Sequence, residues 1–157
     1  MKGIKRVLLV IVLFLCVFSL TGCGTKKSIT ANDFKTYMEK SGYYILDSTS
    51  QYKDSFTLKQ GYIAINANRT YQIEFIEFNT IDEASKIYDI NKNIMEGKKG
   101  QSISGYVDTT GENFSNYRVV TNGRYRVLSR INNTLIYVDE DQAYMNEINK
   151  IIKRLRY

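Results

Sequence analysis

The sequence contains no histidine, no proline and no tryptophan, and it has only two cysteines, Cys16 and Cys23. Catalytic pairs that need an imidazole, such as Ser-His and Cys-His, and metal sites built on histidine are therefore excluded. Cys16 lies inside an apolar N-terminal run, so the polar part of the chain contains one cysteine and cannot form an internal disulfide. The folded part must be stabilised without a covalent cross-link.

The N-terminal segment has the layout of a secretion signal. Lys2, Lys5 and Arg6 form a positive start, and an apolar run from Val7 to Leu20 follows. The run is shorter than the stretch of about 20 apolar residues that a membrane-spanning helix needs, and small residues follow it at once. We expect residues 1–22 to be removed. The rest of the chain is only mildly basic, which does not favour nucleic acid as a partner.

The end of this segment, Leu20-Thr21-Gly22-Cys23, resembles the lipobox of bacterial lipoproteins at all four positions. The resemblance implies that a diacylglycerol is attached to the thiol of Cys23 and that a signal peptidase cuts between Gly22 and Cys23. Two acyl chains give stable membrane attachment, so we expect a lipid-anchored chain at the cell membrane, facing outside the cytoplasm. The alternatives are a secreted protein with an unpaired thiol, or a leader that is kept as the anchor.

Composition divides the rest of the chain into a tether and one domain. Residues 23–28 are small and basic and predict a short tether that begins at the lipidated cysteine, and residues 29–157 suit a single globular domain. Residues 97–113 are rich in glycine, serine and threonine and show no periodicity. Because a long irregular loop is uncommon in a compact domain, we expect a flexible joint there.

Three helices are expected in this domain. Capping boxes predict the start of two of them, with Thr30 and Asp33 in the first and Thr80 and Glu83 in the second. The third is expected from about Glu140, where apolar residues recur at helical spacing toward the end of the chain.

Turn sequences predict the antiparallel strands. Asn122-Gly123 and Asn132-Asn133 suit type I′ turns, which need residues that tolerate positive φ, and alternating apolar residues flank both turns. A further hairpin is expected within residues 56–78. The two asparagine turns fix a pairing register, and one face of the resulting three-stranded unit is the expected core face. That face carries Val120, Tyr125, Val127, Ile136 and Val138.

Together these elements predict an α+β fold, with an antiparallel sheet of five to six strands and three helices packed on one face. Small lipoproteins of Gram-positive bacteria often have such a layout, although no named domain family matches beyond the lipobox. A hairpin followed by a helix occurs twice, at roughly 56–96 and 114–156, which suggests a degenerate internal duplication.

The other face of the three-stranded unit carries the candidate binding residues. Tyrosine and arginine are enriched at binding hot spots, so this face could bind an anionic polymer or a protein. It could instead be a solvated face with stacked Arg and Tyr pairs, or it could be covered by the first helix. The candidate binding face consists of Tyr117, Arg124, Arg126, Leu128, Arg130 and Tyr137.

Catalytic and metal-binding patterns are weak. Glu74 and Glu77 are three residues apart on an expected strand, so they should point to opposite faces and cannot flank one substrate bond. The acids at 139–141 lack the ligand spacing of a calcium-binding loop and suit helix capping. We therefore expect no catalytic residue, metal or cofactor.

The sequence thus favours a membrane-anchored, non-catalytic module that binds a protein or a cell-envelope ligand. An accessory subunit of a membrane complex is the alternative. A carboxylate-based envelope enzyme is the least favoured of the three.

Overall fold

The computed structural model describes residues 24–52, 56–98 and 103–157. The expected leader and Cys23 lie outside the described residues. Within these ranges the fold is α+β, as predicted. The helices are α2 (Ala31–Lys40), α3 (Ile81–Gly97) and α4 (Met145–Arg154). The strands are β1 (Tyr44–Asp47), β2 (Leu58–Ile65), β3 (Gln72–Phe78), β4 (Ile103–Thr110), β5 (Phe114–Thr121), β6 (Arg124–Ile131) and β7 (Thr134–Asp141).

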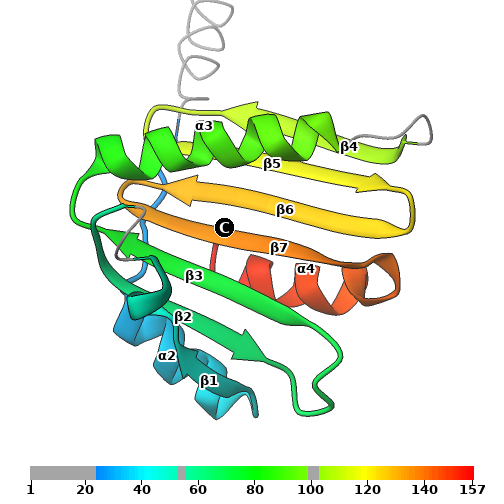
Figure 1. The fold of residues 1–157 in the computed structure, drawn as a ribbon, viewed down its shortest axis with the longest axis horizontal. Coiled ribbons are helices and arrows are strands. Elements are labelled where there is room, and N and C mark those ends of the chain that lie inside the picture. Colours follow the sequence, from blue (N-terminus) through cyan, green and yellow to red (C-terminus); the bar gives the residue numbers. More distant parts are fainter. Residues whose placement is uncertain (1–23, 53–55, 99–102) are drawn as a thin grey trace, which may run out of the picture.

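The seven strands form one antiparallel sheet in the order β1-β2-β3-β7-β6-β5-β4 (Figure 1). The predicted count of five to six strands is too low. Residues 103–110, expected within a flexible joint, form the edge strand β4, and residues 99–102 of that joint lie outside the described residues. Because nearly every side chain of β4 is exposed, the strand carries no alternation of apolar and polar residues that would have revealed it.

The asparagine turns set the register of the central strands as predicted. Asn122, Gly123 and Asn132 have φ of 51°, 72° and 50°, which is the left-handed region that a type I′ turn requires. In this register Arg118 pairs with Val127, Val120 with Tyr125, Val127 with Val138, and Ser129 with Ile136.

Helices cover both faces of the sheet, so the expectation of three helices on one face is wrong. α2 and α4 pack on the face that carries Val127 and Ile136, whereas α3 packs on the face that carries Leu128. Figure 1 shows α3 in front of the sheet and α4 behind it. Neighbouring residues such as Val127 and Leu128 are both fully buried, because each belongs to a different core layer.

The predicted duplication finds no support in this arrangement, because the helix after each hairpin covers a different face of the sheet.

The third helix begins later than expected. Residues 139–141 belong to β7, and a 3₁₀ turn at Gln142–Tyr144 precedes α4. The carboxylate that caps this turn is Asp141, which accepts the N–H of Ala143 at 2.8 Å.

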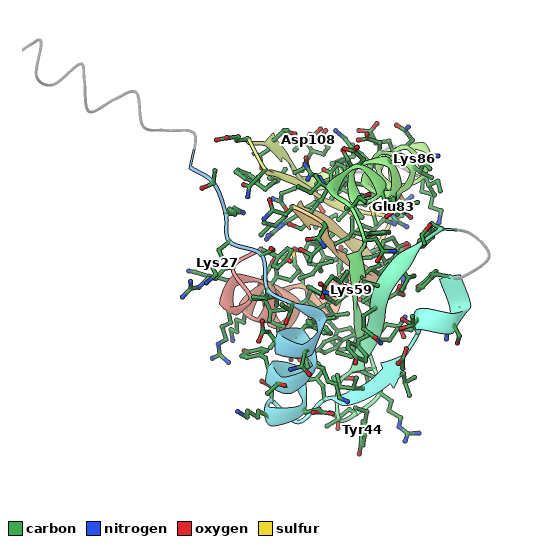
Figure 2. The ribbon with its side chains drawn as sticks, turned by 90° about the vertical axis from the view of Figure 1, so that its left-hand side faces the viewer. Lys27, Tyr44, Lys59, Glu83, Lys86 and Asp108 are labelled. Atoms are coloured by element: carbon green, nitrogen blue, oxygen red, sulfur yellow. The ribbon has the colours of Figure 1, made fainter. Side chains whose placement is uncertain are left out.

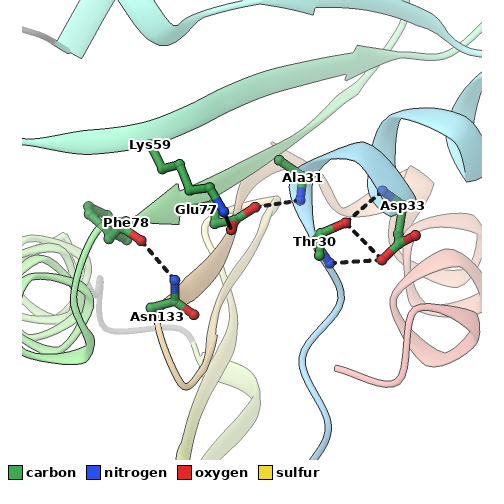
Figure 3. A network of polar contacts seen from close by, with 7 residues as sticks. All are labelled: Thr30, Ala31, Asp33, Lys59, Glu77, Phe78 and Asn133. Carbon is green, nitrogen blue, oxygen red and sulfur yellow. Dashed lines mark hydrogen bonds and ion pairs between the residues drawn. The ribbon is translucent and has the colours of Figure 1, made fainter.

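The first two helices begin at their predicted capping boxes. In α2 the Thr30 side chain accepts the N–H of Asp33, and the Asp33 carboxylate accepts the N–H of Thr30 (Figure 3). A sheet residue adds a second anchor, because Glu77 Oε2 accepts the N–H of Ala31 at 2.8 Å. Lys59 Nζ lies 2.7 Å from Glu77 Oε1.

None of the helices in the described ranges is long and apolar enough to cross a membrane.

Candidate functional site

Most of the predicted binding face lies under α3. Tyr117 and Leu128 are 0% exposed, and Arg126 and Arg130 are only 8% and 7% exposed. The expectation that these four residues form an open surface is therefore wrong. α3 covers the face by placing Ala84, Tyr88 and Met95 against it in one buried cluster, whereas the sequence had suggested the first helix as a cover.

The two remaining residues of that face, Arg124 and Tyr137, are half-buried. Arg124 Nε donates to Asp139 Oδ1 at 2.9 Å, and Arg126 Nε lies 3.2 Å from Asp139 Oδ2. The Asp139 carboxylate thus lies between two guanidinium groups and balances part of their charge. This pairing gives the two arginines a structural role. Asp139 belongs to the sheet and pairs with them, whereas the sequence had suggested that the acids at 139–141 cap a helix.

Glu74 and Glu77 point to opposite faces of β3, as expected. Glu74 accepts the hydroxyl of Tyr52 at 2.8 Å on the α3 side, whereas Glu77 binds the start of α2. Burial of the phenol raises the pKa of Tyr52, and the negative charge of the nearby Glu74 carboxylate raises it further. These two glutamates cannot act as a carboxylate pair on one substrate.

A pocket of about 540 Å³ lies at the end of the sheet where β1 meets the turn between β2 and β3. Its size falls in the range of small-ligand sites. Tyr44 and Leu46 line it and are 54% and 50% exposed, which is unusual for large apolar side chains. Pairing of Tyr44 with Ile65 carries the tyrosine to the turn that holds Arg69. We take this β1–β3 pocket as the candidate binding site.

The lining of the β1–β3 pocket contains one cation, Arg69, and one carboxylate, Glu140. The Arg69 guanidinium lies 5.4 Å from the centroid of the Tyr44 ring. The backbone of Arg69 has a φ of 55°, which is strained for a non-glycine residue. Glu140 Oε1 accepts the N–H of Gln72 at 3.0 Å. Burial raises the pKa of the Glu140 carboxyl above its ordinary value. The pocket therefore offers an aromatic ring, a positive charge and a hydrogen-bonding acid.

The inner wall of this pocket is held by tyrosines. The Tyr71 hydroxyl lies 2.6 Å from that of Tyr43, and the Tyr71 ring lies 5.2 Å from the Tyr144 ring. Sequence reasoning predicted the hairpin within residues 56–78 but missed the pocket. Nothing local in the sequence shows that β1 pairs beside that turn, because the two segments are some twenty residues apart.

Residues 24–28 are bound to the opposite end of the sheet. Asn113 Oδ1 accepts the N–H of Lys26 at 2.9 Å, and Asn113 Nδ2 donates to the carbonyl of Lys26 at 2.7 Å. Asn132 Nδ2 donates to Ser28 Oγ at 3.4 Å, and Lys26 Nζ lies 4.5 Å from the Phe114 ring centroid. The predicted tether is thus held along the β4–β5 and β6–β7 turns.

The described residues show no group of three or more His, Cys, Asp or Glu side chains that could hold a metal ion. Glu140 is the single carboxylate among the described residues that line the β1–β3 pocket. Comparisons of the chain with protein-family models, with curated proteins and with solved structures found no match.

Proposed function

We propose that this protein is a lipid-anchored lipoprotein on the outer surface of the cell membrane, and that it binds a protein or a cell-envelope ligand without catalysing a reaction. The sequence Leu20-Thr21-Gly22-Cys23 supports the anchor. The observation that carries the binding role is the β1–β3 pocket, with exposed Tyr44 and Leu46 beside Arg69. Aromatic and arginine side chains of this kind dominate binding energies at interfaces.

The place of the β1–β3 pocket supports this role. Residues 24–28 lie at the end of the sheet with the 113 and 132 turns, and the β1–β3 pocket lies at the other end. Strands such as β5 have eight residues, which at about 3.3 Å per residue place the two ends roughly 25 Å apart. An anchor at one end leaves the pocket free for a partner at the other.

A specific observation favours the second candidate function, an accessory subunit of a membrane complex. β4 is an edge strand that is paired on one side only. Its side chains Ile103, Tyr106 and Val107 are 49%, 48% and 43% exposed. An unpaired strand edge accepts a strand from another protein readily. In this alternative the partner is an integral membrane protein that adds to β4.

The test of the anchor is the mass of the protein purified from native membranes. We expect a chain that begins at Cys23 and carries the mass of a diacylglycerol. A Cys23→Ser variant should keep its leader and lose the added mass. An intact leader or a free thiol in the wild-type protein would refute the anchor.

The test of the binding site is photo-crosslinking in living cells. Tyr44 is replaced by a photoreactive phenylalanine derivative, and Lys86 on α3 is replaced in the control, because Figure 2 shows these two residues at opposite extremes of the molecule. We expect an adduct from position 44 that disappears when Arg69→Ala is added. The same adducts from both positions, or none from position 44, would refute the β1–β3 pocket as the site.

A further inference from the structure

We propose that the end of the sheet that binds residues 24–28 is a docking surface for anionic phospholipid headgroups. The domain is then held on the membrane in one orientation, with the β1–β3 pocket facing away from the lipid. The proposal rests on the proposed lipid anchor at Cys23. It commits to one occupant, a bilayer that contains anionic lipid.

The contacts of residues 24–28 set the distance between the domain and the membrane. The side chain of Asn113 binds both backbone groups of Lys26, so the domain surface begins at that residue. Lys26 is the third residue after Cys23, and a fully extended chain spans at most about 3.6 Å per residue. The domain surface at Lys26 therefore lies within about 11 Å of the anchored residue. At this distance the domain surface around Lys26 can contact the lipid headgroups.

Three exposed cations surround the point where the chain enters the domain. Lys27, Arg154 and Arg156 line a hollow of about 290 Å³, together with the exposed acid Asp33. None of the three cations belongs to an ion pair within the part of the chain that the structure describes. Figure 2 shows Lys27 on the side that carries α2 and α4, pointing away from the sheet. Asp33 offsets part of the Lys27 charge, and the remaining positive charge is available to an external anion.

Two further cations lie behind this rim. The Lys26 ammonium is half-buried beside the Phe114 ring, and burial together with the nearby Arg118 guanidinium lowers the pKa of Lys26. Arg118 is held by the side chains of Asn116 and Asn149 and also donates to the main-chain oxygen of Tyr157 at 3.3 Å. Lys26 and Arg118 repel each other beside the tether, and an anionic surface placed there would relieve that repulsion.

The charge pattern specifies the orientation as well as the attraction. Each basic residue near an anionic bilayer surface strengthens binding about fivefold, so the three exposed cations together contribute roughly a hundredfold. The sheet end with the β1–β3 pocket lies roughly 25 Å away, beyond the Debye length of about 8 Å at physiological salt. The three tether-end cations therefore draw that end of the domain, and not the pocket end, toward the membrane.

The test is energy transfer from the lipidated protein to a dye on lipid headgroups. The protein is reconstituted in vesicles of phosphatidylcholine, with or without phosphatidylglycerol. Cys23 is acylated, so a fluorophore can be attached to Glu112→Cys at the tether end or to Ala67→Cys at the pocket end, where both native residues are exposed. We expect much stronger transfer from position 112 on the anionic vesicles and a smaller difference on phosphatidylcholine alone.

Matched variants separate local charge from total charge. The variant Lys27→Gln, Arg154→Gln, Arg156→Gln should lose the orientation on anionic vesicles. The control Lys40→Gln, Lys86→Gln, Lys98→Gln removes the same charge from exposed sites elsewhere and should keep it. Equal transfer from positions 112 and 67 on anionic vesicles would overturn the proposal. Equal effects of the two triple variants would also overturn it.

Two further outcomes are distinguished. The first is measured by the protection of Lys27 from an amine-labelling reagent. Soluble polyphosphate is added to the protein on phosphatidylcholine vesicles, and the protection is compared with that on vesicles that contain phosphatidylglycerol. Stronger protection by polyphosphate would mean that the surface binds an anionic polymer, and the lipid proposal would fail. If the mass of the protein shows a free thiol, the proposed anchor fails instead. The docking surface is then tested by sedimentation of the same chain with anionic vesicles, where the tether-end triple variant should bind roughly a hundredfold more weakly. Unchanged binding would overturn it.

Discussion

Replacing Glu77 should separate the two tasks of its carboxylate, which are to accept a buried N–H and to place negative charge at the start of α2. Glu77 is 7% exposed and accepts the Ala31 N–H at 2.8 Å. Glu77→Ala leaves that N–H without an acceptor, at about 1–3 kcal/mol. Loss of the favourable charge at a helix N-terminus adds about 1 kcal/mol. We expect a total loss of about 3 kcal/mol, or roughly 10 °C in Tm.

Glu77→Gln keeps an oxygen that can accept the Ala31 N–H, so it should lose only about 1 kcal/mol. The ion pair with Lys59 adds little, because the Lys59 side chain is 63% exposed and its charge returns to water. Urea unfolding followed by circular dichroism measures both free energies, and hydrogen exchange at Ala31 reports the N–H directly. Glu74→Ala, on the same strand but half-exposed, is the control and should lose about 1 kcal/mol. Equal destabilisation by the Ala and Gln variants of Glu77 would refute the reasoning.

Three other variants test the pocket and the ends of two helices. Burial raises the pKa of Glu140, so the folded chain favours the protonated acid and loses stability as the pH rises from the ordinary pKa of 4.5 through the folded value. Glu140→Gln should therefore have a higher Tm than the wild type at pH 7 but an equal one at pH 4, and a gap that does not change with pH would contradict this. Gly42 has a φ of 83°, so Gly42→Ala should lose about 1 kcal/mol. Gly97 ends α3 without a positive φ and without a close neighbour, so Gly97→Ala should be neutral or stabilising by up to about 1 kcal/mol. The same urea titration measures both glycine variants. A smaller loss of stability for Gly42→Ala than for Gly97→Ala would refute the left-handed conformation of Gly42.

Local chemistry made part of the fold predictable. The Asn122-Gly123 turn requires positive φ at both positions, and few residues adopt it, so the hairpin and its register could be read directly. The capping boxes at Thr30 and Thr80 are equally local, because their hydrogen bonds join residues three apart. The strands and helices that such turns and caps define were found close to their true limits.

The candidate site was not predictable for a different physical reason. Arg126 and Arg130 alternate with apolar residues along β6, and this pattern suggested a solvated face. Long arginine stems can pack under a helix while their charge is balanced elsewhere, as Asp139 does for Arg126. Which face α3 covers depends on contacts far apart in sequence. The same is true of the pairing of β1 with β2, which forms the pocket beside Arg69.

The position of β7 in the sheet has a consequence for biosynthesis. β7 is the last strand to leave the ribosome, yet it lies between β3 and β6. Until Thr134 and the residues after it emerge, the nascent chain consists of two separate strand groups, each with a bare edge at the future centre of the sheet. Such edges invite pairing with other nascent chains. The addition of β7 therefore joins the two strand groups into one sheet, and a chain truncated before β7 would leave the two groups unpaired.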